Sequence, residues 1–145
     1  MIDQEPRNAA SELIRLTFER FQDRDFWEHE IRNILAPNFV RRDRRKLIGM
    51  PDANADEWIA AQFEYERVAG RFGSWHDIEI VAVRGDRYVA ARVLNRLGDL
   101  GENELVFVEQ LDADLERVEL ISLFDPDDID EAIAELDRLH TEIDD

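Results

Sequence analysis

Cysteine is absent from this sequence of 145 residues, and glycine, proline and histidine are scarce, with six, four and three copies. Without cysteine the chain can form no disulfide, no thiolate metal site and no cysteine nucleophile. The histidines at positions 29, 76 and 140 lack the spacing of a zinc site, and the acids after Asp125 lack the turn glycine of a calcium loop. We therefore expect neither a metal nor a cofactor.

Long apolar runs are also missing, so no segment predicts a membrane span. The first residues lack the basic and apolar regions of a signal peptide, and we expect a cytoplasmic protein. Hydrophobic residues make up 44% of the chain, which is enough for one good core at this length. Residues 1–145 are therefore expected to form a single domain.

Positive charge is sparse, and the formal net charge is −17. Residues 112–145 hold 14 of the 35 acids against only Arg117 and Arg138. The negative electrostatic potential of these acids disfavours nucleic acid and anionic membranes as partners. One basic island, residues 41–46, interrupts the pattern. The simpler interpretation pairs it with the acidic tail or a partner subunit, and the alternative is a rim that attracts anions.

Apolar residues at helical spacing predict three helices in the first half of the chain. The first begins after Pro6 and reaches Phe21, the second is capped by Asp25 and ends before Pro37, and the third runs from Asn54 to Gly70. A short extended piece, residues 39–46, separates the second from the third. A final helix over residues 129–139 follows an acidic first turn.

From residue 75 the apolar period changes to two, which predicts strands near residues 76–84, 88–97, 104–112 and 116–124 in an antiparallel meander. Hairpins without bulges would place His76 opposite Asn95, and Arg92 opposite both Glu79 and Glu109. One face would then be almost wholly aliphatic and pack under helices. The other would carry the row Glu79, Arg92, Glu109 beside apolar residues, and we expect this face to form a homodimer interface.

His76 and Asn95 are the leading pocket candidates, because helices over a curved sheet leave an opening at one end. The register places these two polar residues there. Trp75 and Tyr65 could line the same mouth. The alternative is a boundary histidine with simple packing of the two aromatic rings.

Asp43 is the best candidate acid, because the arginines around it would hold it ionised and orient it. An ionised, paired aspartate is a weak base, so a structural network of Asp43 with these arginines is the alternative. Gln62 and Glu66, on the inner stripe of the third predicted helix, could supply polar lining instead. A small rotation of that helix would place either at the surface.

Three stretches of this sequence resemble a bacterial subgroup of the SnoaL-like domains in the nuclear transport factor 2-like superfamily. They are residues 35–45 (LAPNFVRRDRR), 78–87 (IEIVAVRGDR) and 124–130 (FDPDDID). The resemblance extends over nearly the whole chain and implies an α+β fold. In this fold three N-terminal helices pack on a curved antiparallel sheet of four or more strands to form a cone, and a C-terminal helix follows.

The same resemblance leaves the function open, because the fold hosts enzymes, binding modules and dimerisation domains. Enzymes of the superfamily use an aspartate, often with histidine, tyrosine or asparagine, on apolar ring substrates. Only the loose grouping of Asp43, His76 and Asn95 is similar to such sets. The first hypothesis is a dimeric domain that binds an apolar or cyclic small molecule. The alternatives are a cofactor-independent cyclase, isomerase or epoxide hydrolase working by acid–base chemistry, and a purely structural dimerisation module.

Overall fold

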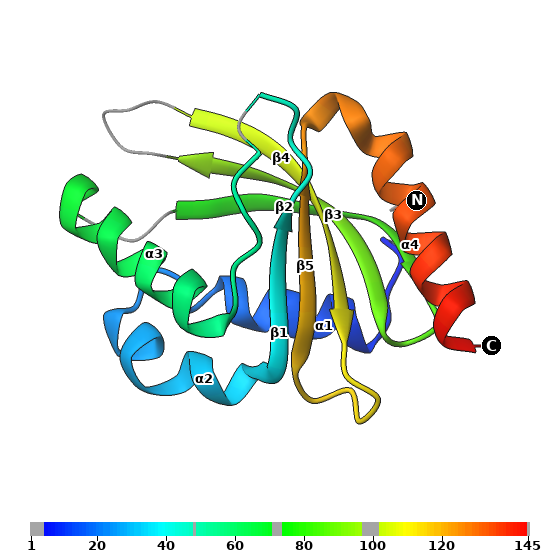
Figure 1. The fold of residues 1–145 in the computed structure, drawn as a ribbon, viewed down its shortest axis with the longest axis horizontal. Coiled ribbons are helices and arrows are strands. Elements are labelled where there is room, and N and C mark those ends of the chain that lie inside the picture. The colour runs from blue at the N-terminus through cyan, green and yellow to red at the C-terminus, as the bar shows by residue number, and fades with distance from the viewer. Residues whose placement is uncertain (1–4, 48, 71–73, 97–101, 145) are drawn as a thin grey trace.

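A computed structural model describes residues 5–47, 49–70, 74–96 and 102–144 of the chain. Five strands form one mixed sheet in the order β1-β5-β4-β3-β2 (Figure 1). They are β1 (Leu35–Asp43), β2 (Ser74–Arg84), β3 (Tyr88–Arg96), β4 (Glu102–Leu111) and β5 (Val118–Phe124). Strands β2 to β5 form the predicted antiparallel meander, and β1 joins its end by pairing in parallel with β5. The predicted α+β architecture is confirmed.

The helices follow the predicted order. They are α1 (Ala9–Phe18), a π-helical turn η1 (Phe26–Glu30) that continues into α2 (Ile31–Ile34), α3 (Ala55–Ala69), a 3-10 turn η3 (Pro126–Asp128) and α4 (Ile129–Asp144). No helix in these described ranges is long and apolar enough to cross a membrane.

The predicted cap of α3 is confirmed. The Asn54 side chain accepts from the Glu57 N–H, the Glu57 side chain accepts from the Asn54 N–H, and Gly70 ends the helix in the left-handed conformation. A second reciprocal cap, formed by Asn8 and Ser11, starts α1. The predicted cap at Asp25 was wrong, because its side chain makes no capping hydrogen bond.

β1 begins earlier than the sequence predicted, because α2 ends at Ile34 and Leu35 is already extended. Pro37 lies inside this strand. A sheet tolerates proline there because β1 is an edge strand, which has a neighbouring strand on one side only. The register between β1 and β5 also shifts near this point.

Two hydrophobic clusters lie on opposite faces of the sheet. The inner cluster joins the sheet to α1, η1, α2 and α3, and the outer cluster joins it to α4, which lies on the right in Figure 1. The inner face of the meander carries Ile80, Val89, Ala91, Val93, Leu105, Phe107, Leu111, Ile121 and Leu123. The outer face carries Tyr88, Ala90, Val106, Val108, Leu120 and Phe124.

The prediction of which β4 residues lie on each face of the sheet was wrong. Arg92 pairs with Val106 and not with Glu109, so β4 is displaced by three residues along β3. An odd displacement exchanges the two faces of a strand. Glu109 therefore lies opposite Val89, on the inner face, and the row Glu79, Arg92, Glu109 does not form.

The half-apolar face that we assigned to a homodimer is covered in part by the chain itself. Tyr88 and Leu120, which we expected at a subunit interface, are buried against α4. Arg92 still pairs with Glu79, at 3.6 Å, and its second acidic partner is Glu104, at 3.1 Å. The predicted acid–base–acid motif thus exists on the outer face with Glu104 in the place of Glu109.

The basic island pairs with the acidic tail, as the simpler interpretation predicted. Arg44 contacts Glu135 at 3.1 Å, and Lys46 contacts Asp128 at 3.2 Å and Glu131 at 3.5 Å. The backbone N–H of Lys46 also donates to Asp125. Two of the stretches that carry the family resemblance, residues 35–45 and 124–130, are therefore neighbours in space.

Candidate functional site

Glu109 is the most unusual polar residue of the inner face. It lies on β4 between Val89 of β3 and Ile121 of β5, and it shares its face with Phe107 and Leu111. The residue is only 4% exposed, and its Oε2 atom has no hydrogen-bond partner among the described residues. A buried carboxyl without a partner is costly to keep, which marks it as a candidate for function.

Burial raises the pKa of Glu109 from its ordinary value of 4.5 to about 8. The carboxyl is therefore mostly protonated at pH 7, because the apolar surroundings disfavour its charged form. A protonated carboxyl donates one hydrogen bond and can also deliver its proton in acid catalysis. Glu109 thus has the properties of a hydrogen-bond donor or general acid.

Aromatic rings line the inner face around this strand. Phe18 of α1 stacks on Phe107 with 5.6 Å between ring centroids. Trp27 lies 5.1 Å from Phe21 and 5.4 Å from Trp58, between the N-terminal helices and α3. The indole N–H of Trp27 donates to the carbonyl of Phe21 at 2.8 Å, so this ring has no free donor. The resulting wall is apolar.

Arg41 is a second buried charged residue of this face, at 7% exposure. Its guanidinium donates to the Pro51 carbonyl at 2.9 Å, and the backbone groups of Arg41 and Ala53 exchange two hydrogen bonds. Burial lowers the pKa of Arg41 from its ordinary value. These contacts hold residues 50–53 against β1 and close that side of the inner face.

No protein-family model and no curated protein sequence matches this chain. Solved structures do. A candidate polyketide cyclase from Xanthomonas campestris pv. campestris is 15% identical with a TM-score of 0.58, over 88% of this chain and 96% of that one. An LEH-like epoxide hydrolase from M. tuberculosis is 12% identical with a TM-score of 0.56, over 92% of this chain and 89% of that one.

The designed NTF2 fold protein NT-9 is 11% identical with a TM-score of 0.53, over 92% of this chain and 97% of that one. The chain has the NTF2-like fold. The resemblance inferred from the sequence is confirmed at this level, and at such low identity the comparisons show the fold alone.

Within this NTF2-like fold, Asp43 lies at the end of β1 opposite Leu123, with its side chain completely buried. The carboxylate accepts from Arg45 through Nε at 2.9 Å, Nη2 at 2.7 Å and the backbone N–H at 3.0 Å, and from the Met50 N–H at 3.1 Å. Burial alone would raise the pKa of Asp43, but these hydrogen bonds outweigh it and leave the pKa below its ordinary value. Asp43 is thus an ionised anchor for the loop after β1.

His76 and Asn95 are not the cross-strand pair that we predicted. Trp75 pairs with Asn95 and His76 pairs with Leu94, because the register of β2 shifts between His76 and Glu79. Asp77, inside this bulge, has a positive φ of 54°. The side chains of Trp75, His76 and Asn95 lie outside the described part of the NTF2-like fold, and their pocket roles stay predictions.

The other predicted lining residues lie along α3. Glu66 forms an ion pair with Arg24 at 3.0 Å, and Gln62 is half-buried. The hydroxyl of Tyr65 is buried and has no hydrogen-bond partner among the described residues. Tyr65 therefore has a buried polar atom without a partner among the described residues, whereas Glu66 is already paired with Arg24.

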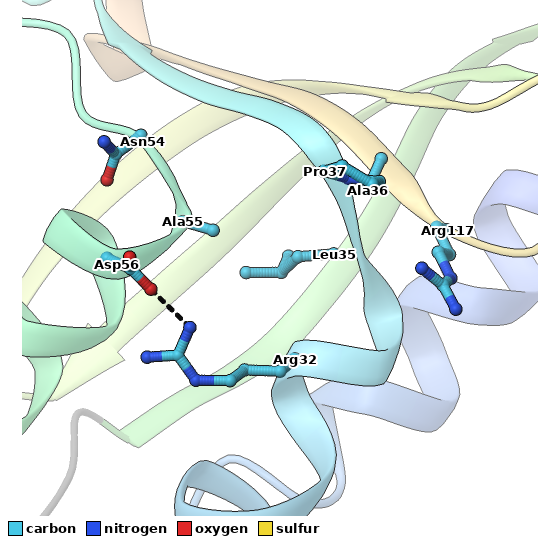
Figure 2. Close-up of a pocket in the computed structure, with 8 residues that line it drawn as sticks. All are labelled: Arg32, Leu35, Ala36, Pro37, Asn54, Ala55, Asp56 and Arg117. Atoms are coloured by element: carbon cyan, nitrogen blue, oxygen red, sulfur yellow. Dashed lines mark hydrogen bonds and ion pairs between the residues drawn. The ribbon is translucent and has the colours of Figure 1, made fainter.

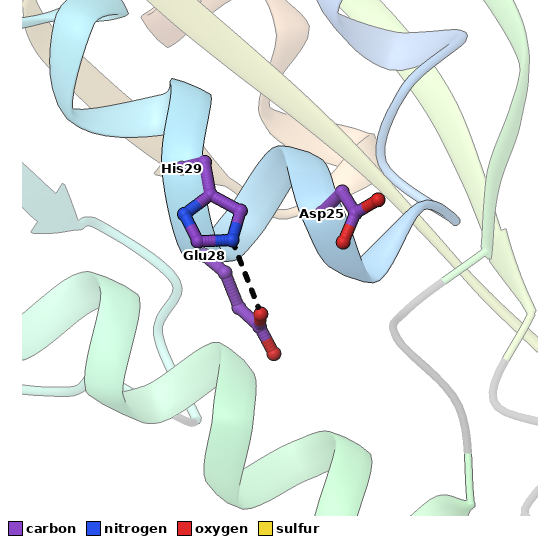
Figure 3. Close-up of side chains that lie close together, drawn as sticks. All are labelled: Asp25, Glu28 and His29. Atoms are coloured by element: carbon purple, nitrogen blue, oxygen red, sulfur yellow. Dashed lines mark ion pairs between the residues drawn. The ribbon is translucent and has the colours of Figure 1, made fainter.

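An exposed group of possible metal ligands lies at the start of η1. The ligand atoms of Asp25, Glu28 and His29 lie within 4.8 Å of one another (Figure 3). Glu28 already contacts Arg24 at 2.6 Å and His29 at 3.5 Å. All three residues are exposed, and nothing else in the described structure points to an ion there.

A hollow of about 310 Å³ lies where α2 and β1 meet the start of α3 (Figure 2). Arg32 from α2 reaches across to Asp56 of α3 and forms an ion pair, while Arg117 lies on the opposite wall. Glu109 is not among the residues that line it. This hollow therefore does not give access to the buried carboxyl.

Proposed function

We propose that this protein binds an apolar small molecule against the inner face of the sheet, with Glu109 as the polar group that orients it. The single observation that carries this proposal is the buried carboxyl of Glu109, which lies among aliphatic and aromatic side chains and has an Oε2 atom without a partner among the described residues. Ligand sites are mostly apolar with a few well-placed polar groups, and this arrangement fits that description.

The protonation of Glu109 defines the ligand further. Since its pKa is raised to about 8, the neutral carboxyl would donate to a carbonyl, ether or epoxide oxygen at neutral pH. An anionic ligand would be disfavoured, because its charge would be moved from water into the same apolar surroundings that keep Glu109 neutral. The proposed ligand is therefore neutral, apolar or cyclic, and has one acceptor atom.

An enzymatic form of the same proposal assigns acid–base catalysis to Glu109. Two of the similar structures are a candidate polyketide cyclase and an LEH-like epoxide hydrolase. By analogy the reaction would be a cyclisation, isomerisation or hydrolysis of an apolar cyclic substrate, with Glu109 delivering its proton to the substrate oxygen. Asp43 suits the role of base less well, because four hydrogen bonds hold its charge. His76 and Asn95 stay candidates for positioning the substrate.

Homodimerisation is a separate part of the proposal. The surface would be the outer-face cluster of Glu79, Arg92 and Glu104, which α4 leaves partly exposed. Light scattering on the parent and on an Arg92→Glu variant tests it. A dimer that dissociates in the variant supports this surface, and a monomeric parent at high concentration excludes it.

The binding test compares cyclohexanone with methylcyclohexane, which has a similar shape but no acceptor. Chemical shifts of the inner-face aromatic rings should respond to both, and cyclohexanone should bind the parent about tenfold more tightly, as one buried hydrogen bond predicts. Glu109→Leu should remove this preference. Glu104→Gln, on the same strand but the outer face, is the matched control and should retain it.

Two results would contradict the proposal. If neither compound moves the inner-face signals, the cone serves only as a structural module. If Glu109→Leu keeps the preference for cyclohexanone, another group orients the ligand. Incubation with cyclohexene oxide then tests catalysis, because diol formed by the parent and lost in Glu109→Gln would establish a hydrolase.

A further inference from the structure

A second hollow, of about 420 Å³, lies on the outer face of the sheet. Its walls are the outward side of the edge strand β1, the adjoining part of β5 and β4, and the last turns of α4. The lining residues are Asn38, Val40, Arg42, Gln110, Glu119, Leu120, Arg138, Leu139 and Glu142. Gln110 directly follows Glu109 in β4 and lies on the opposite face of the sheet. The sheet therefore separates this hollow from the inner face.

All but one of the charged side chains that line this outer hollow are paired with a side chain of opposite charge. Glu119 accepts from Gln110 at 2.7 Å and pairs with Arg87 at 3.1 Å. Arg138 pairs with Glu142 and with Glu135, both at 3.3 Å. Arg42 is half-buried, and its guanidinium makes neither a hydrogen bond nor an ion pair with any described residue, although its backbone belongs to the β1–β5 ladder. One guanidinium is thus the unbalanced charge of the hollow.

The hollow also has an apolar wall, and an unsatisfied polar group that does not itself line the hollow lies beside Arg42 on the same face of the sheet. Val40, Leu120 and Leu139 belong to the outer hydrophobic cluster and line the hollow. Ser122 pairs with Arg42 across the β1–β5 ladder, is completely buried, and its hydroxyl has no partner among the described residues. A cation, an unused hydroxyl and an apolar floor lie together on one face.

We propose that this outer hollow is a second binding site, which takes a small carboxylate with an apolar body. The carboxylate would accept the forked N–H groups of Arg42, which match its two oxygens and form strong charge-assisted hydrogen bonds. The apolar body would cover Val40, Leu120 and Leu139. The volume lies within the range of small-molecule sites. This site takes an anion, whereas the proposed inner site takes a neutral ligand.

The test uses hexanoate, hexanamide and hexylammonium as probes, with binding measured from backbone amide shifts of the full chain. Hexanoate should move the signals of residues 38–42 and 138–142, and bind at least tenfold more tightly than hexanamide or hexylammonium. Arg42→Gln should weaken hexanoate binding about tenfold, and Arg42→Lys should weaken it less. Arg67→Gln, an exposed variant on α3, is the matched control and should change nothing.

Three results would overturn the proposal. Equal binding of hexanamide and hexanoate to the parent would show that no cation recognises the ligand. Unchanged hexanoate binding in Arg42→Gln would assign recognition to another group. Shifts confined to the inner-face residues would place hexanoate in the cone. The comparison of the three probes needs only the parent protein, so it decides the question even if Arg42→Gln fails to fold.

Discussion

Arg41 and Glu109 flank the same residue, Ile121, from opposite sides of β5. Both are buried, both lie in one cross-strand row, and neither an ion pair nor a hydrogen bond joins their side chains among the described contacts. The guanidinium turns to the Pro51 carbonyl at 2.9 Å, while the carboxyl stays in apolar surroundings. Burial raises the pKa of Glu109, and this divergence leaves the carboxyl without a cationic partner among the described residues that would offset the effect.

The buried carboxyl makes stability depend on pH. The pKa of Glu109 is about 8 in the folded protein against an ordinary value of 4.5, so the folded state holds a proton that the unfolded state releases between these values. The contribution of Glu109 to the free energy of unfolding has its full value below pH 4.5. It falls by about 1.4 kcal/mol per pH unit as the pH rises toward 8. At pH 7 we expect Glu109→Gln to be more stable than the parent by about 3 kcal/mol.

Urea unfolding of the parent and of Glu109→Gln at pH 5, 6, 7 and 8 measures this effect. The difference between the two proteins should widen across this range and level off above pH 8. Glu104→Gln, the half-exposed neighbour on the outer face, provides the control and should follow the parent at every pH. A constant difference between parent and Glu109→Gln would show that the carboxyl keeps an ordinary pKa.

Asp43 has the opposite pH dependence. Its pKa lies below the ordinary value of 3.8, so the stability it provides is present above that pH and is lost as the pH falls through the folded-state pKa. Asp43→Asn leaves the half-buried Arg45 without the completely buried carboxylate that pairs with it, and should cost about 3 kcal/mol at pH 7. The two unfolding curves should converge in acid. Asp52→Asn, an exposed acid of the same loop, should have little effect.

The contacts between the basic island and α4 should differ in strength according to burial. Arg44→Ala removes a partner of Glu135, whose side chain is only 7% exposed, and should cost about 1 kcal/mol. Lys46→Ala removes an ammonium group that is itself exposed from its pairs with the half-buried Asp128 and the exposed Glu131, and should leave the urea midpoint nearly unchanged. In a Glu135→Gln background Arg44→Ala should lose most of its effect. Equal costs for the two single variants would refute this ranking.

The packing of α4 against the outer face of the sheet should depend on Leu136, which is completely buried in the outer cluster. Leu136→Ala leaves a cavity between α4 and the sheet and should cost about 2–5 kcal/mol. Ala134→Ser, on the exposed side of the same helix, is the control. Thermal unfolding measures both. A small loss in Leu136→Ala would indicate that α4 contributes little to the folded state, and that the outer face is available to a partner.

Element order and the cap of α3 could be predicted because they depend on local signals. The Asn54 and Glu57 pair and the Gly70 stop act within one helix, and the alternating apolar residues of each strand need no knowledge of the neighbouring strands. Aspartate is a common helix-capping residue, but the backbone of Asp25 does not have the conformation of a cap. Its φ and ψ are helical, and a cap needs extended backbone.

Strand register could not be predicted, because the run Leu105-Val106-Phe107-Val108 is apolar on both faces. Such a run gives no alternation by which to choose the inner face. β4 is displaced by an odd number of residues relative to both β3 and β5. The residues of β4 therefore lie on the opposite faces from those predicted, while the residues of β3 and β5 lie on the predicted faces. Glu109 was therefore predicted at a subunit interface but lies in the core. Its position directly after this two-sided apolar run was the one available signal of burial.

The parallel pairing of β1 with β5 has a consequence for how the chain folds. Among the described residues of the first half of the sequence, β1 pairs only at the isolated bridge between Arg41 and Ala53, and its ladder is completed by residues 118–124. Contacts so distant in sequence are slow to form, because a long loop must close before they contribute free energy. During synthesis on the ribosome, β1 cannot complete its ladder until residues 118–124 have emerged. The last strand of the meander thus controls when β1 becomes native.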